Sequence, residues 1–158
     1  MKIANLSPDS KIWIYQSNRK FTDSEVAQIT EKGSEFISLW NSHGNMLKAA
    51  IEVKHNLFVI FGVDEIQAKA SGCSIDKSVA FIKEIEARLK VSLLDRMQIA
   101  YKKEDEITSS HLMEFELQLK SGHLNENTIV FNNLVTTKEE FDSSWELPVK
   151  DSWHKSLL

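Results

Sequence analysis

The residues with the clearest potential for chemistry lie together in the stretch Ser-Gly-Cys-Ser-Ile-Asp-Lys-Ser, residues 71–78. Gly72 followed by Lys77-Ser78 resembles the loop that holds phosphates in nucleotide-hydrolysing proteins. That loop requires a glycine directly before the lysine, where backbone N–H groups turn toward the phosphates. Here the spacing is one residue short, and Asp76, which would repel a polyphosphate, precedes the lysine. The stretch therefore does not predict an ATPase.

A simpler chemistry for the same stretch is the binding of a small anion. Ser71 to Ser74 supplies several candidate N-caps for a helix that runs to about Leu89. The free N–H groups of a helix N-terminus attract carboxylates and phosphates. Alternatively, the serine hydroxyls satisfy these groups themselves. The predicted ligand-binding residues are Ser71, Gly72, Cys73, Ser74 and Lys77.

The single cysteine lies just before this helix start, where the helix dipole favours a thiolate. A cysteine nucleophile also needs a base, and His43 or His55 could approach Cys73 in the folded chain. The catalytic residues are therefore unknown, with Cys73, His43 and His55 as candidates. The more common role of a lone cysteine is that of a small, partly buried side chain.

Composition excludes several classes of function. The chain has 158 residues, a net charge of −4 and no basic run, so we expect no nucleic-acid partner. The longest apolar run, residues 57–63, is too short to span a bilayer, and the first residues do not form a signal peptide. The histidines show no metal-ligand spacing, and we expect no cofactor. With one cysteine, no internal disulfide can form, which favours the cytoplasm.

The pattern of apolar residues predicts an α+β protein. Thr22 and Glu25 form a capping box before a helix that ends near residues 41–44. Residues 48–55 alternate as an edge strand does, whereas residues 57–63 are apolar on both faces, as a central strand is. With strands at residues 12–15 and 97–101, the order is that of a ferredoxin-like βαββαβ core over about residues 11–102.

Residues 103–158 form a C-terminal α/β extension, which we expect to pack on the first half so that residues 1–158 make a single domain. Residues 109–120 fit either a strand or a helix, and the absence of any β-branched residue among them favours a helix. We expect a strand at residues 128–135 and a short helix after Thr137. The last residues carry Trp145 and Trp153, and are expected to dock on the body of the protein.

Several phrases of the sequence resemble an uncharacterised family of short bacterial proteins. They are WIYQSNR at 13–19, SGCSIDKS at 71–78, DRMQIAY at 95–101, TIVFNN at 128–133 and KDSWH at 150–154. Some members of that family carry a transporter-ATPase label. This chain has neither a complete phosphate loop nor the signature of such ATPases. The resemblance implies no catalytic residue.

The sequence favours a non-enzymatic cytoplasmic binding or interaction protein, with a small-anion site at residues 71–78. Ferredoxin-like sheets often pair through their edges or faces, which makes a homodimer one expected assembly. The alternative is a small enzyme or thiol sensor that uses Cys73.

Overall fold

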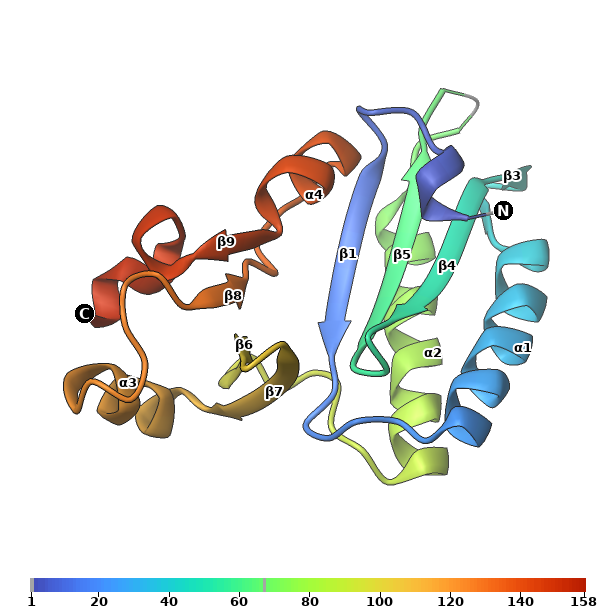
Figure 1. Cartoon of the computed structure of the whole chain (residues 1–158). Helices are drawn as coiled ribbons and strands as arrows, with labels where there is room; N and C mark the ends of the chain where they lie inside the picture. The colour runs from blue at the N-terminus through green and yellow to red at the C-terminus, as the bar shows by residue number, and fades with distance from the viewer. Residues whose placement is uncertain (1, 67) are drawn as a thin grey trace.

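The first half of the chain forms a three-stranded antiparallel sheet covered by two helices (Figure 1). The computed structural model describes residues 2–66 and 68–158. Strands β1 (Lys11–Gln16), β5 (Phe58–Asp64) and β4 (Lys48–Lys54) lie in that order. Every residue of β5 is buried, as expected for a central strand with apolar side chains on both faces. The expectation that β4 is an edge strand is also confirmed.

Helices α1 (Asp23–Leu39) and α2 (Gly72–Leu89) cover one face of this sheet and enclose the first hydrophobic core. The predicted capping box at Thr22 is present, with Glu25 as its partner. The backbone N–H of Glu25 donates to Thr22 Oγ1 at 3.1 Å, and the N–H of Thr22 donates to Glu25 Oε1 at 2.9 Å. A Cβ atom on Gly33 of α1 would lie 2.7 Å from Ile51 Cδ1, so α1 approaches β4 closely at this residue.

A small hairpin follows α1 and consists of β2 (Asn41–Ser42) and β3 (Asn45–Met46). Its turn is His43-Gly44, in which both residues have positive φ, 51° and 84°. This backbone conformation suits a two-residue hairpin turn. Helix α1 itself ends at Leu39, shortly before the predicted residues 41–44, and Trp40 is already extended.

The second half contains a four-stranded antiparallel sheet, in the order β7-β6-β8-β9. Its strands are β6 (Gln98–Lys103), β7 (Glu106–His111), β8 (Ile129–Phe131) and β9 (Glu146–Pro148). Helices α3 (Leu112–Lys120) and α4 (Lys138–Ser144) belong to the same half, as do the short 3-10 helices Val149–Asp151 and Trp153–Leu157. The expected helix at 109–120 is therefore found from Leu112 onward, whereas residues 109–111 end β7.

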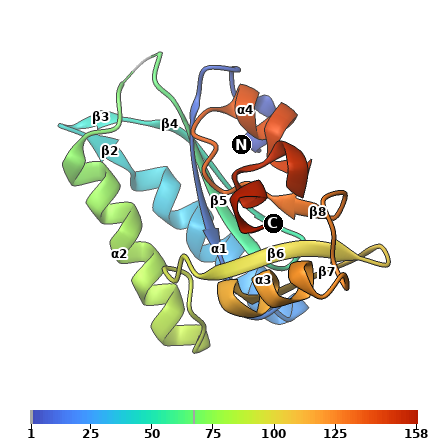
Figure 2. The same cartoon turned by 90° about the vertical axis from the view of Figure 1, so that its left-hand side faces the viewer.

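The ferredoxin-like topology is not confirmed. Its first three strands have the expected order, but β6 does not lie beside β1 as the fourth strand. Instead β6 pairs with β7 over six residues through the turn Glu104-Asp105, whose φ angles are both positive. This local hairpin fixes one edge of β6, and β8 pairs with the other. Figure 2 shows β6 running across the direction of β1.

The second half packs on the face of the three-stranded sheet that the helices leave open. A second hydrophobic core there includes Phe58 of β5, Phe131 of β8 and Trp145. The Trp145 ring lies 4.9 Å from each of the two phenylalanine rings, centroid to centroid. The N-terminal 3-10 helix Ile3–Asn5 joins the same core above Gly62. Within the described residues, no helix has the length and apolar character needed to cross a membrane.

Candidate functional site

The turn at residues 71–78 uses its serine hydroxyls within the turn itself. Ser71 is the N-cap of α2, and its Oγ accepts the N–H of Ser74 at 3.2 Å. In return, Ser74 Oγ accepts the N–H of Ser71 at 2.6 Å. The carbonyl of the buried Ser74 accepts the indole N–H of Trp40 at 2.8 Å. The Ser78 hydroxyl donates to the carbonyl of Ile75.

Three of the predicted ligand-binding residues, Gly72, Cys73 and Lys77, are exposed beside this cap. Gly72 has no atom near the position of a Cβ, and Lys77 is exposed on the first turns of α2. The small-anion site at Ser71, Gly72, Cys73, Ser74 and Lys77 therefore stays a prediction, in which an anion would have to bind beside an intact serine cap.

The three candidate catalytic residues are not all brought together. Cys73 is exposed on the first turn of α2, and the β2–β3 hairpin that carries His43 lies beside this end of the helix (Figure 2). His55 lies in the β4–β5 turn, at the start of β5, whereas α2 begins beyond the end of β5. A seven-residue strand is about 20 Å long. The structure thus separates His55 from Cys73.

His55 instead lies, as an exposed residue, at the edge of the second core. Its ring stacks on Trp145, and its Nε2 lies 3.4 Å from Glu146 Oε1. Burial lowers the pKa of His55 from its usual value, although the nearby Glu146 carboxylate acts in the opposite direction. The surroundings of His55 are those of a packing residue at the junction of the two halves.

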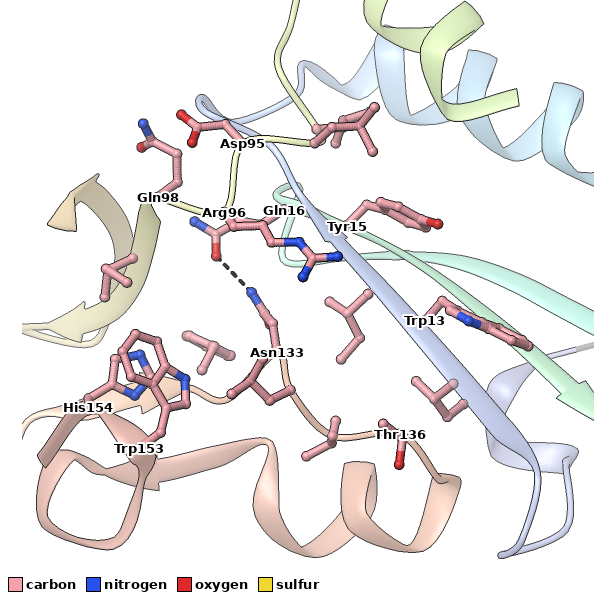
Figure 3. A pocket seen from close by; sticks show the side chains of 18 residues that line it. Trp13, Tyr15, Gln16, Asp95, Arg96, Gln98, Asn133, Thr136, Trp153 and His154 are labelled. Carbon is pink, nitrogen blue, oxygen red and sulfur yellow. Dashed lines mark hydrogen bonds between the residues drawn. The ribbon is translucent and has the colours of Figure 1, made fainter. Parts of the chain in front are cut away.

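A cavity of about 350 Å³ lies between β1 and the second half of the chain (Figure 3). Its walls are the outer edge of β1, the segment before β6, the turn after β8 and the C-terminal 3-10 helix. Most of the lining is apolar, and its polar side chains include Gln16, Asp95, Arg96, Asn133 and His154.

The outer edge of β1 presents backbone groups to this cavity. The N–H of Ser17 donates to the Leu57 carbonyl, on the side of β5, whereas the N–H of Ile12 donates to the Thr136 carbonyl on the opposite side. Backbone groups of a strand alternate between its two edges. The N–H and C=O groups of Ile14 and Gln16 therefore point outward, and no hydrogen bond to them on this edge is found within the described residues.

The Gln16 side chain is buried in the cavity wall with one half of its amide unpaired. Gln16 is 6% exposed, and its Oε1 accepts the Nδ2–H of Asn133 at 3.0 Å. Asn133 Oδ1 in turn accepts the indole N–H of Trp145 at 2.9 Å. Gln16 Nε2 has no partner among the described residues. Since an unpaired buried donor costs free energy, this atom marks a place for a hydrogen-bond acceptor.

His154 forms the opposite wall of the cavity and is neutral at physiological pH. It is 1% exposed, and burial lowers its pKa to about 4. Its Nδ1 is hydrogen-bonded to Ser152 Oγ at 2.7 Å, and its ring stacks on Trp153 with centroids 3.9 Å apart. The positive charge in the cavity lining therefore comes from Arg96, whose side chain extends toward β1 and Asn133 (Figure 3).

Analysis of the sequence alone does not find this cavity, because its polar residues come from four separate segments. A signal was nevertheless present in the sequence. Four of the five phrases that carry the family resemblance contribute a cavity residue, namely Gln16, Arg96, Asn133 and His154. The phrase at residues 71–78 does not contribute to the cavity.

Comparisons of this chain with protein-family models, with curated proteins and with solved structures found no match. The resemblance to a bacterial family stays an expectation, and function has to be argued from the geometry.

Proposed function

We propose that the protein is a non-enzymatic binding protein whose ligand occupies the cavity beside β1. The observation that carries this proposal is the buried Gln16 Nε2, which lines the cavity and has no partner within the described part of the chain. The volume of about 350 Å³ lies in the range of small-ligand sites. An apolar lining with a few convergent polar groups is also typical of such sites.

The side chains around the cavity favour binding over catalysis. A nucleophile with an adjacent base would be needed for covalent chemistry. The His154 imidazole could serve as a base, but its hydrogen-bond partner Ser152 is 3% exposed and so has little access to a ligand. Gln16, Asn133 and Arg96 are hydrogen-bonding side chains, and none of the three is a nucleophile.

The experiment is a titration of ¹⁵N-labelled protein with benzamide, which combines an apolar ring with an amide acceptor. We expect saturable shifts of the side-chain amides of Gln16 and Asn133. The variant Gln16→Met should weaken this binding at least about fivefold, because it removes a hydrogen-bond donor. The control Gln28→Met, on α1, should not change it. Absence of any shift at the cavity, both with benzamide and with the peptide acid described in the next section, would overturn the proposal.

A parallel titration with inorganic phosphate tests the small-anion site of the sequence analysis. Saturable shifts of the Gly72 and Cys73 amides, lost in Lys77→Ala, would establish that site. Gly72 and Cys73 belong to the first turn of α2, whose N–H groups are the ones an anion would meet.

The alternative function, a small enzyme or thiol sensor that uses Cys73, has one observation in its favour. Cys73 is exposed beside the hairpin that carries His43.

A homodimer is also proposed, because β4 is an edge strand of the three-stranded sheet and such edges support pairing between copies. Sedimentation of the purified chain tests the dimer. The lone cysteine favours a reducing cytoplasm.

A further inference from the structure

We infer that the ligand of this cavity is the C-terminal end of an extended peptide, which adds to the outer edge of β1 as a short strand. This inference rests on the proposed binding function and names the class of partner. Three features support it: the unpaired edge of β1, the closure of that edge at both ends, and the charge of Arg96.

The unpaired groups have the spacing of a strand ladder. The N–H and C=O groups of Ile14 and Gln16 face the cavity, and the two residues are separated by about 7 Å along β1. Alternating donors and acceptors at this spacing match the backbone of an extended peptide. Gln16 Nε2 adds a further donor for a peptide carbonyl.

The chain itself already pairs with this edge at one position. Thr136 accepts the N–H of Ile12, and Thr137 forms an antiparallel bridge with Lys11. Before Thr136 the chain turns away from β1, because Asn132 accepts the N–H groups of Leu134 and Val135 through its side chain and its carbonyl. The rest of the edge is the place that a fourth strand takes in a complete ferredoxin-like sheet.

The edge is closed on both sides of Ile14 and Gln16. Thr136 closes it at Ile12, and at the other end the N–H of Asn18 donates to the Ser92 carbonyl. The unpaired part of the β1 edge is too short for a long partner strand, which would have to continue past a blocked end. The last residues of a chain can pair along it. The partner therefore contributes a terminus.

The charge of Arg96 determines which terminus of the peptide binds in the cavity. Arg96 is an exposed residue whose guanidinium lies beside β1 at the cavity (Figure 3), and no ion pair of Arg96 is found within the residues that the structure describes. The neighbouring Asp95 accepts the N–H of Met97 with its Oδ1. Arginine pairs with carboxylates in a two-pronged geometry, so a free C-terminal carboxylate fits and an amino terminus does not.

The apolar lining of the cavity determines which side chains the peptide can carry next to its C-terminal carboxylate. Besides β1 itself, residues from three segments contribute to this lining, namely Leu93, Ile99, Phe131, Val135 and Trp153. We therefore expect apolar, β-branched or aliphatic side chains at the end of the peptide, because these bury well and favour extended backbone.

The test uses the full chain and the probe acetyl-Val-Thr-Val-Leu with a free carboxylate, compared with the same peptide as a C-terminal amide. We expect the amide to bind about tenfold more weakly or worse, since it lacks the charged partner of Arg96. Arg96→Met should weaken the acid to the level of the amide and leave the amide unchanged. The control Arg88→Met, an exposed arginine on α2, should change neither.

Hydrogen exchange distinguishes strand addition from any other mode of binding. The free acid should slow exchange of the Ile14 and Gln16 amides and leave those of Trp13 and Tyr15 unchanged, because the latter already pair with β5. A peptide with N-methylated backbone should lose this effect.

The outcomes separate this inference from the proposed function. If benzamide binds the cavity and no peptide does, or if acid and amide bind equally, the inference is rejected and the binding function stands. If neither benzamide nor peptide binds, both are rejected.

Discussion

The turn at residues 71–78 and the cavity beside β1 both gather polar groups at one place, but they differ in how those groups are satisfied. At the turn, Ser71 and Ser74 satisfy one another across three residues of sequence. In the cavity, Gln16 depends on Asn133, which lies 117 residues away, and still keeps one unpaired nitrogen.

The difference shows why a conspicuous motif need not be the site that is open to a ligand. A helix cap is built from neighbours in sequence, so residues next to the free N–H groups also satisfy some of them. A cavity between separate segments has no such local compensation. Its polar groups face space that a ligand can fill.

The largest expected effect comes from Trp145→Ala, in the second core behind the Gln16–Asn133 pair of the cavity wall. This change removes a buried ring that stacks on Phe141 and packs against Phe58, and it leaves Asn133 Oδ1 without its donor. We expect a loss of about 3–5 kcal/mol in the free energy of unfolding, measured by urea denaturation. Leu39→Ala, a change at a side chain that is 76% exposed near the other site, should cost less than about 0.5 kcal/mol. Equal losses would show that Trp145 is not a core residue.

A second effect depends on pH and is expected at the cavity but not at the turn. Because burial lowers the pKa of His154 from 6.5 to about 4, the unfolded chain binds a proton at a higher pH than the folded chain does. The corresponding stability is complete above pH 6.5 and is lost as the pH falls toward 4, by about 3 kcal/mol.

Ring-proton shifts of His154, followed by NMR from neutral to acid pH, check this expectation directly. A midpoint above pH 6 for His154 would contradict it. The variant His154→Gln should flatten the fall in stability, and His123→Gln, at an exposed side chain, should retain it.

A smaller effect is expected at the turn. Ser71→Ala removes the oxygen that accepts the Ser74 N–H, and should cost about 1 kcal/mol in urea denaturation. Binding of benzamide and of the peptide acid should be unaffected, because α2 does not line the cavity. Loss of peptide binding in this variant would show that the turn contributes to binding at the cavity, and would contradict the difference between the two sites.

The smallest effect is expected for Cys73→Ser, since the thiol is exposed. Stability should change by less than about 0.5 kcal/mol. An enzyme or thiol sensor would require alkylation of Cys73 that is already fast below about pH 7, and slower alkylation in His43→Ala. A binding protein requires neither, so the alkylation rate against pH decides between the two functions.

Much of the local structure could be predicted from the sequence. The cap of α1 at Thr22, the start of α2 within residues 71–74 and the central position of β5 all follow from patterns of adjacent residues. The strand β7 could not be predicted from such a pattern, because residues 106–111 are as polar as a surface loop. The strand forms because it pairs with β6.

By itself, the sequence determined the α+β class, the helix caps and the apolar faces, because each depends on contacts within one or two turns of the chain. The tertiary structure decided where β6 lies and which edge of β1 stays open. These choices depend on competition between strand pairings that are far apart in sequence, and the periodicity of a strand does not reveal its partner. For the same reason, Gln16, Arg96, Asn133 and His154 become a candidate site only when the two halves pack together.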